Sequence, residues 1–272
     1  MLRVKDWKFP TTHRSGWILY RLLQLRFAHK DQILKLFFPQ ESKAQLFTYH
    51  ISKMVEQGLL AKEDNMYWVT SLGRQILLFM KDNPDVPKEK LYADVFNQIN
   101  KNEIEDTPNK GNPGAEAWLH RRMIAETLIH FFGTGYDKTD SKIELKVKDL
   151  PDIKPDNTII SDRALGFIEC ENKTNLKETR DKIIRYTRYY FSGDFHSQFN
   201  KEYARVFMVV NDQKKLDDLV KFVMEITFKK VGFKEPIHQS NDYVGRNLFR
   251  FSLLDINEPE FRWWKAVEWT RN

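Results

Sequence analysis

The segment from residue 155 to 173, PDNTIISDRALGFIECENK, constrains the fold of this chain more than any other. Asp156 opens a short β-branched run, a turn-forming stretch follows at 161–164, and an apolar run then ends in Glu169 and Glu171. Two short extended runs joined by such a turn predict a β-hairpin. Pairing of the two strands would bring Asp156 beside the acidic end of the second strand.

Charged side chains are concentrated where these two strands are expected to end. Side chains at positions i and i+2 of a strand share a face, so Glu169, Glu171 and Lys173 can point the same way. Carboxylate oxygens hold Mg²⁺ or Mn²⁺, and an ammonium can stabilise or activate an attacking water. The pattern predicts a metal-dependent hydrolytic site, although Pro-Asp is also ordinary turn chemistry and Glu171 also fits a solvated strand end.

The amino-acid composition limits the number of domains and the kinds of site that the chain can have. The chain has 272 residues, 41% of them hydrophobic, which allows one large domain or two ordinary ones with real cores. A single cysteine, Cys170, excludes an intrachain disulfide and a cysteine-rich zinc site. No apolar run is long enough for a membrane span, and the first ten residues lack the apolar core of a signal peptide. We therefore expect a cytoplasmic protein without membrane partners.

The positive charge of the chain lies in its N-terminal third. Residues 1–80 contain twelve Lys or Arg and six Asp or Glu, whereas the remaining residues contain 32 of each. The whole formal net charge of +6 is therefore carried by the first 80 residues. Such asymmetry is typical of a module that meets a polyanion.

The same region has the pattern of three helices, a hairpin and a fourth helix. Apolar residues at helical spacing predict helices over 12–27, 29–38 and 42–57, the last ended by Gly58. Two short runs around a polar turn at 63–65 predict a hairpin, and a fourth helix is expected from Ser71. This is the element order of a winged helix-turn-helix.

The stretch GLLAKEDNMYWVTSLGRQIL resembles the wing of winged-helix transcription regulators, and the matching residues are Gly58, Leu59, Leu60, Thr70, Gly73 and Arg74. The resemblance implies that the third helix enters the DNA major groove and that the wing contacts phosphate or the minor groove. The polar residues expected to contact DNA are Ser42, Lys43, Gln45, Thr48, Tyr49, Lys53 and, on the wing, Lys62. The alternative is a winged helix used for dimerisation or protein contact.

Three segments are expected: a winged-helix domain at 1–82, a linker with a short helix at 83–114, and a second domain at 115–272. The second domain has the order helix, several strands, helix, buried strand, helix, which predicts an α/β fold with a mixed sheet. The expected strands are 143–147, 157–160, 165–171, 204–210 and 248–253, and the expected helices are 115–132, 176–191 and 214–230.

This order resembles the PD-(D/E)xK, or restriction-endonuclease-like, superfamily. The resemblance implies metal ligation by Asp156, Glu169 and a helical glutamate, Glu126 or alternatively Glu116. Glu171 stands where the superfamily has its lysine. The resemblance implies that Lys173, or Lys182 on the next helix, could supply the missing amine.

A winged helix followed by a degenerate domain of this kind resembles the replication-relaxation family of plasmids and mobile elements. The matching features are His120 and Arg121, Pro155-Asp156, the Glu169 and Glu171 pair followed by Thr174, and Lys182-Ile183 with Tyr186. The resemblance implies a protein that binds double-stranded DNA in replication, DNA processing or transcription control. We expect its nuclease-like domain to be weak or inactive, with Mg²⁺ or Mn²⁺ only if the site is functional. A metal-dependent endonuclease or nickase is the alternative, and a second copy of the chain is the other candidate partner.

Overall fold

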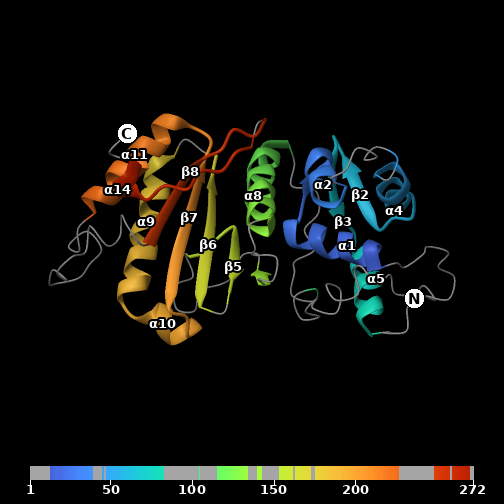
Figure 1. The fold of residues 1–272 in the computed structure, drawn as a ribbon, viewed down its shortest axis with the longest axis horizontal. Coiled ribbons are helices and arrows are strands. Elements are labelled where there is room, and N and C mark those ends of the chain that lie inside the picture. The colour runs from blue at the N-terminus through green and yellow to red at the C-terminus, as the bar shows by residue number, and fades with distance from the viewer. Residues whose placement is uncertain are drawn as a thin grey trace. The chain divides into compact units, whose positions relative to one another are not determined.

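The computed structural model describes residues 13–38, 45, 47–82, 104, 115–133, 140–142, 153–161, 163–172, 175–226, 248–257 and 259–269. The chain divides into two compact units, Met1–Pro113 and Gly114–Asn272, which we call the first and the second unit (Figure 1). Most of the segment predicted as a linker, 83–114, lies outside the described residues.

The first unit contains helices α1 (His13–Leu25), α2 (Lys30–Phe37) and α5 (Ser71–Asp82) and a β-hairpin. Of the third predicted helix, the structure describes the π-helical turn η2 (Thr48–Ser52) running into α4 (Lys53–Glu56), with residues 45 and 47 also helical. The hairpin strands are β2 (Leu60–Glu63) and β3 (Met66–Val69), and an additional short strand, β1 (Ala28–His29), completes a sheet of order β1-β3-β2. The predicted helices and hairpin thus occur in the predicted order.

The hairpin turn follows from its two central residues. Asp64 and Asn65 have φ angles of 45° and 64°. A two-residue hairpin turn with two positive φ angles matches the twist of the strands, and aspartate and asparagine tolerate this region better than most residues. Short-range sequence chemistry therefore determines where β2 ends and β3 begins.

The residues that resemble a wing have specific packing roles. Gly58 has φ 70° and ends α4, with Gly58 N donating to Val55 O and Leu59 N donating to Met54 O. The Thr70 hydroxyl donates to the carbonyl oxygen of Gly58 at 2.5 Å and accepts from the amide of Gly73 at 3.1 Å. These two bonds connect the end of the third helix to the start of α5.

Gly73 lies in the first turn of α5, where the helix packs against the chain that enters β2. A Cβ atom at Gly73 would overlap the carbonyl oxygen of Leu59, so only glycine permits this approach. The spacing between Gly58, Thr70 and Gly73 thus reflects their shared task, which is to hold the two ends of the hairpin against the third helix and α5.

The second unit is built on a five-stranded mixed sheet of order β4-β5-β6-β7-β8. Its strands are β4 (Asp140–Lys142), β5 (Asn157–Ile160), β6 (Ala164–Glu171), β7 (Tyr203–Val210) and β8 (Phe249–Leu253). The β4–β5 and β5–β6 pairs are antiparallel, whereas the β6–β7 and β7–β8 pairs are parallel. The predicted α/β class with a mixed sheet is therefore confirmed.

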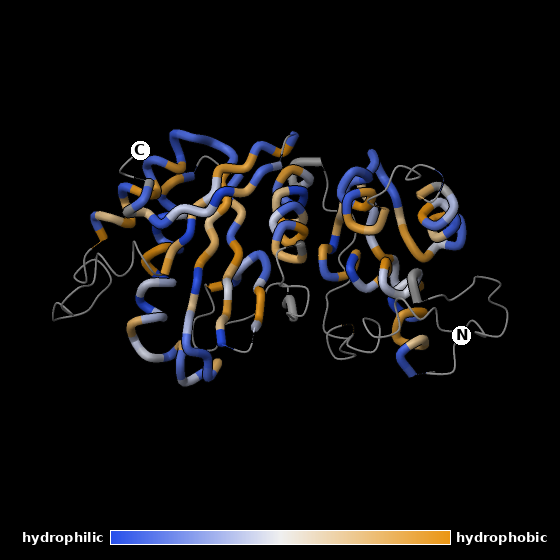
Figure 2. The backbone as a smooth tube through the Cα atoms, in the orientation of Figure 1, coloured by the Kyte–Doolittle hydropathy of each residue, from blue (hydrophilic) through white to orange (hydrophobic). Residues whose placement is uncertain are grey.

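Helices cover both faces of this sheet (Figure 1). Helix α8 (Ala115–Gly133) packs on one face, where Phe131 lies against Phe207 with ring centroids 4.7 Å apart. Helices α9 (Leu176–Phe191) and α11 (Gln213–Glu225) pack on the other, around buried Phe167 and Met208. Successive side chains of β6 and β7 point to opposite faces of the sheet, so apolar residues at consecutive positions make both faces apolar. Figure 2 shows hydrophobic residues recurring along these strands.

The remaining element predictions differ mainly at their ends. The predicted helices 115–132, 176–191 and 214–230 correspond to α8, α9 and α11, although residues 227–230 lie outside the described part. The strand predicted at 143–147 also lies outside it. Two short helices, α10 (Asp194–Phe199) and α14 (Ala266–Trp269), were not predicted. Among the described residues, no helix is long and apolar enough to cross a membrane.

Candidate functional site

The β5–β6 hairpin brings Asp156 to the acidic end of β6. Asn157 is paired with Ile168, and the amide of Asp156 donates to the Ile168 carbonyl at 2.9 Å. One oxygen of Asp156 accepts from the amide of Cys170 at 2.8 Å. Asp156 is therefore held directly beside the stretch of β6 that carries Glu169 and Glu171.

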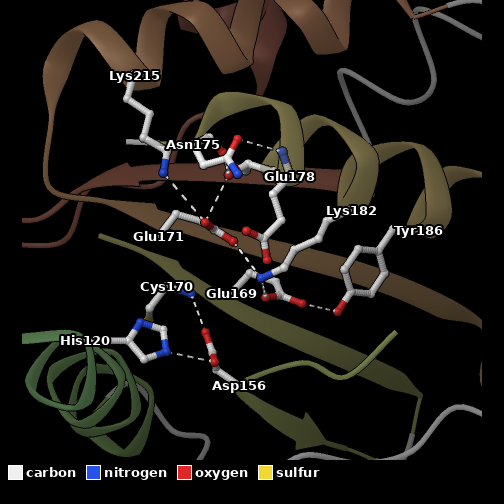
Figure 3. A network of polar contacts seen from close by, with 11 residues as sticks. His120, Asp156, Glu169, Cys170, Glu171, Asn175, Glu178, Lys182, Tyr186 and Lys215 are labelled. Carbon is white, nitrogen blue, oxygen red and sulfur yellow. Dashed lines mark hydrogen bonds and ion pairs between the residues drawn. The ribbon is translucent and has the colours of Figure 1, made fainter. Parts of the chain in front are cut away.

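Both glutamates point toward α9, where one lysine binds them together (Figure 3). Lys182 Nζ lies 2.9 Å from Glu169 Oε2 and 2.7 Å from Glu171 Oε1. The Tyr186 hydroxyl donates to Glu169 Oε1 at 2.6 Å. Since Glu169 and Glu171 are two residues apart on a strand, their common orientation follows from the strand repeat. The amine comes from the next helix, and Lys173 lies outside the described residues.

Glu171 has two further partners on the helices above it. The Thr179 hydroxyl donates to Glu171 Oε2 at 3.0 Å, and Lys215 Nζ lies 3.6 Å from the same oxygen. Thr179 precedes Lys182 by one helical turn, so both lie on the face of α9 that meets the sheet. Lys215 lies in the first turn of α11, and its amide donates to the capping carboxylate of Asp212 at 2.7 Å.

A histidine on α8, which covers the face of the sheet opposite to α9, contacts Asp156. His120 Nε2 lies 3.0 Å from Asp156 Oδ1, the oxygen that does not accept from Cys170 (Figure 3). The residue of α8 that contacts Asp156 is therefore His120, whereas Glu126 was the α8 residue expected to complete the carboxylate cluster. Glu126 is buried on α8, and the side chain of Glu116 lies outside the described part.

Burial and neighbouring charges shift the proton affinities of the cluster. Burial raises the pKa of Glu169 to about 7, although the charge of Lys182 opposes this. Burial also acts to raise the pKa of Asp156, but His120, the Cys170 amide and Lys182 outweigh it and hold that pKa below its usual value. Burial acts to lower the pKa of Lys182, but Glu169 and Glu171 outweigh it, so the pKa is raised and the amine stays charged.

Two more groups of the network respond to burial. Burial raises the pKa of the Tyr186 hydroxyl well above its ordinary value, and the charge of Glu169 adds to this effect. Burial lowers the pKa of Lys215, while the attraction of Glu171 opposes the shift. At neutral pH, the Tyr186 hydroxyl therefore stays protonated and donates a hydrogen bond to Glu169.

The arrangement does not fit a divalent cation as it stands. The carboxylate of Asp156 is directed to His120 and the Cys170 amide, whereas Glu169 is directed to Lys182 and Tyr186. Within the described ranges, no group of three or more His, Cys, Asp or Glu side chains is placed to hold a metal ion. The metal-ligand role expected for Asp156, Glu169 and Glu126 therefore stays a prediction.

The sequence did not identify Lys215 or Thr179, and it indicated Tyr186 only as part of a family resemblance. One signal for Lys215 was present, because a lysine in the first turn of a helix opposes the helix dipole unless a carboxylate compensates it. Thr179 and Tyr186 lie on the same helical face as Lys182, at spacings of three and four residues. These spacings indicate that the centre of this face of α9 is polar.

The first unit carries a separate group of exposed side chains. Gln45, Tyr49 and Lys53 recur every four residues along the third helix, and all three are exposed, with Tyr49 at 52%. Lys53 Nζ lies 4.1 Å from the centre of the Tyr49 ring. Lys62 on β2 is exposed, with its amine 5.8 Å from the ring of Tyr67. Ser42, Lys43 and the side chain of Thr48 lie outside the described part.

Comparison with known proteins identifies no matching family model, no similar curated protein and no similar solved structure. The exposed helix face of the first unit and the buried network of the second unit are therefore the features from which function is inferred.

Proposed function

We propose that this chain is a DNA-binding protein of the replication-relaxation type, in which the first unit is a winged helix that reads duplex DNA. The observation that carries this proposal is the exposed stripe of Gln45, Tyr49 and Lys53 on the third helix. We call these three residues the polar stripe. In winged helices the third helix is the one that enters the major groove.

The chemistry of the polar stripe suits a base-reading surface. A glutamine amide can bond the edge of adenine, a tyrosine can contact bases or phosphate, and a lysine neutralises phosphate. The Lys53 ammonium lies over the Tyr49 ring, and both side chains are exposed. The opposite face of the helix is anchored, since Ile51 and Met54 are completely buried.

The wing and the charge distribution support the same proposal. Lys62 lies at the exposed end of β2, next to the turn made by Asp64 and Asn65. The excess of six basic residues in the first 80 positions would attract the phosphate backbone and make binding dependent on salt. The protein would act in the cytoplasm, on the replication, processing or transcription of plasmid or mobile-element DNA.

The second unit would be a nuclease-like domain that cleaves DNA weakly or not at all. Its three carboxylates, Asp156, Glu169 and Glu171, are already bonded to histidine, lysine, hydroxyl and amide donors. This domain would have a structural role or contact a second copy of the chain.

DNA binding can be tested on the full chain by fluorescence anisotropy with duplex DNA over a range of salt concentrations. Replacing Lys53 and Lys62 with Ala should weaken binding and reduce the slope of log affinity against log salt by roughly one for each lost phosphate contact. Lys221→Ala is the matched control, because this exposed lysine lies on α11 of the second unit. Affinity and slope that change equally in the variant and the control would reject the proposal.

A metal-dependent endonuclease is the second candidate, and the position of Lys182 favours it. The sequence has Glu171 where a lysine is expected, but the amine of Lys182 reaches Glu169 from α9. Incubation with supercoiled plasmid and Mg²⁺ or Mn²⁺ distinguishes the two candidates. Nicking by the wild type that disappears in Asp156→Asn, with DNA binding retained, would make the endonuclease the correct assignment.

A further inference from the structure

We propose that the second unit binds single-stranded DNA on the face of its sheet that carries Tyr203, Arg205 and Arg250. We call these three residues the arginine-tyrosine patch. They lie on the neighbouring strands β7 and β8 (Figure 1). The inference goes beyond duplex binding by the first unit, and only the choice of DNA as the nucleic acid rests on the proposed function.

The strand repeat and the register place the side chains of the patch on one face of the sheet. Tyr203, Arg205 and Phe207 alternate along β7 with residues that are buried in the core formed with α9 and α11. Phe207 is the β7 partner of Arg250 on β8, and paired residues of neighbouring strands point to the same side. Because the Phe207 ring also contacts α8, the patch lies on the α8 face, opposite to the buried carboxylate network.

Tyr203 offers an exposed aromatic ring in a cationic setting. The residue is 41% exposed, and the guanidinium carbons of Arg163 and Arg205 lie 5.5 and 5.6 Å from the centre of its ring. Arg163 Nε donates to Glu202 Oε2 at 2.9 Å, and Arg163 Nη2 donates to the Tyr203 hydroxyl at 3.1 Å. These contacts hold the ring at the surface, where an unpaired base can stack on it.

Arg205 and Arg250 bring positive charge to the same surface. Both are half-buried, and Nη1 of each donates to the carbonyl oxygen of the preceding residue at 2.8 Å. Burial lowers the pKa of Arg250, and the charge of Arg205 adds to this shift, whereas Glu268 opposes it. The two guanidinium groups are thus close enough to repel each other, and a phosphate bound beside them would relieve this repulsion.

An aromatic row continues the surface beside the arginines. A Cβ atom at Gly166 would lie 2.8 Å from the Phe207 ring, so glycine at this position lets the ring lie against β6. The centroid of the Trp263 ring lies 5.0 Å from that of Phe207, and Phe261 is stacked on Trp263 with centroids 5.7 Å apart. All three rings are partly exposed. Aromatic and basic side chains are therefore interleaved on this face.

The interleaving of rings and guanidinium groups favours a single strand over a duplex. Positions i and i+2 of a β-strand are about 7 Å apart, which is comparable with the distance between successive phosphates of an extended single strand. In a duplex the bases are stacked on one another, so the exposed ring of Tyr203 would have no base to contact. Binding of an acidic peptide or an anionic membrane would depend on the arginines and not on the tyrosine ring.

The experiment measures binding of the full-length chain to a fluorescein-labelled oligothymidine of roughly 12 nucleotides by fluorescence anisotropy. Tyr203→Ala should weaken binding roughly 5- to 150-fold, the range for loss of one stacked base, whereas Tyr203→Phe keeps the ring and should bind like the wild type. Arg205→Gln should weaken binding and reduce the slope of log affinity against log salt by about 0.7, the value for one phosphate of a single strand. Lys221→Gln is the matched control, because it removes the same charge from α11 on the other face of the sheet.

The two kinds of substitution decide the proposal together. Losses in Tyr203→Ala and Arg205→Gln, with Tyr203→Phe and Lys221→Gln unchanged, would support it. Equal affinity of Tyr203→Ala and the wild type would overturn it, because binding would then depend on charge alone, and so would the absence of binding by the wild type. Tyr203→Leu fills more of the space and gives the same test if Tyr203→Ala does not fold. Tighter binding of an oligouridine of the same length would overturn the choice of DNA.

These outcomes are separable from those of the duplex-binding proposal. Replacing Lys53 and Lys62 with Ala should weaken duplex binding and leave the affinity for oligothymidine unchanged, whereas substitutions in the arginine-tyrosine patch should do the reverse. Failure of duplex binding would leave the tyrosine-dependent affinity for oligothymidine intact. Loss of oligothymidine binding in the Lys53 and Lys62 variant alone would assign that binding to the first unit and overturn this inference.

Discussion

The raised pKa of Glu169 predicts that the second unit loses stability as the pH rises through the weakly acidic range. Burial raises this pKa from an ordinary value of 4.5 to about 7. Below pH 4.5 the carboxyl group is protonated in both the folded and the unfolded chain. Between pH 4.5 and 7 the unfolded chain releases the proton while the folded chain retains it, so folding becomes less favourable. Above pH 7 both states are ionised and this contribution becomes constant.

The magnitude follows from the distance between the two pKa values. Each pH unit between them corresponds to about 1.4 kcal/mol, so the complete loss is about 3 kcal/mol. No reduction for solvent screening is needed, because the Glu169 side chain is only 2% exposed. For a unit of this size the loss corresponds to a fall in melting temperature of roughly 6 to 12 °C.

The assay compares the wild type with Glu169→Gln between pH 4.5 and 8. Glutamine cannot ionise, so the variant should lack this part of the decline in stability. Hydrogen exchange of peptides from β6 reports the second unit alone, and thermal unfolding gives the overall shift. Glu225→Gln, which removes a well-exposed carboxylate from α11, is the control and should follow the wild type. Parallel pH curves for the wild type and Glu169→Gln would refute the reasoning.

Three other substitutions test individual contacts. Tyr186→Phe removes the 2.6 Å hydrogen bond to Glu169 and should cost about 1.5 to 3 kcal/mol in urea unfolding; a cost below 0.5 kcal/mol would contradict a structural role for that bond. Lys215→Met should destabilise the second unit by about 1 to 3 kcal/mol, because Glu171 keeps Lys182 but loses a buried cation, and suppression of this cost by Glu171→Gln would identify the pair as its source. Gly73→Ala should lower the melting temperature of the first unit by several degrees, because a Cβ would overlap the Leu59 carbonyl oxygen; an unchanged temperature would show that α5 shifts freely.

Local chemistry made much of each unit predictable. The hairpin of the first unit follows from a turn that aspartate and asparagine accept, and the end of the third helix follows from Gly58 at positive φ. In the second unit, the shared orientation of Glu169 and Glu171 follows from the two-residue repeat of a strand. Such features depend on neighbours within a few residues, so the order of residues alone specifies them.

The partners of those glutamates depend instead on how the helices pack. Lys182 follows Glu169 by 13 positions, whereas His120 precedes Asp156 by 36. Lys215 comes from α11, and strand β7 lies between it and Glu171 in the sequence. Periodicity places each of these side chains on a helical face, but it does not say how far along the sheet that face lies. The sequence by itself determined which carboxylates gather at the end of β6, and only the packing of α8, α9 and α11 decided which side chains bond to them.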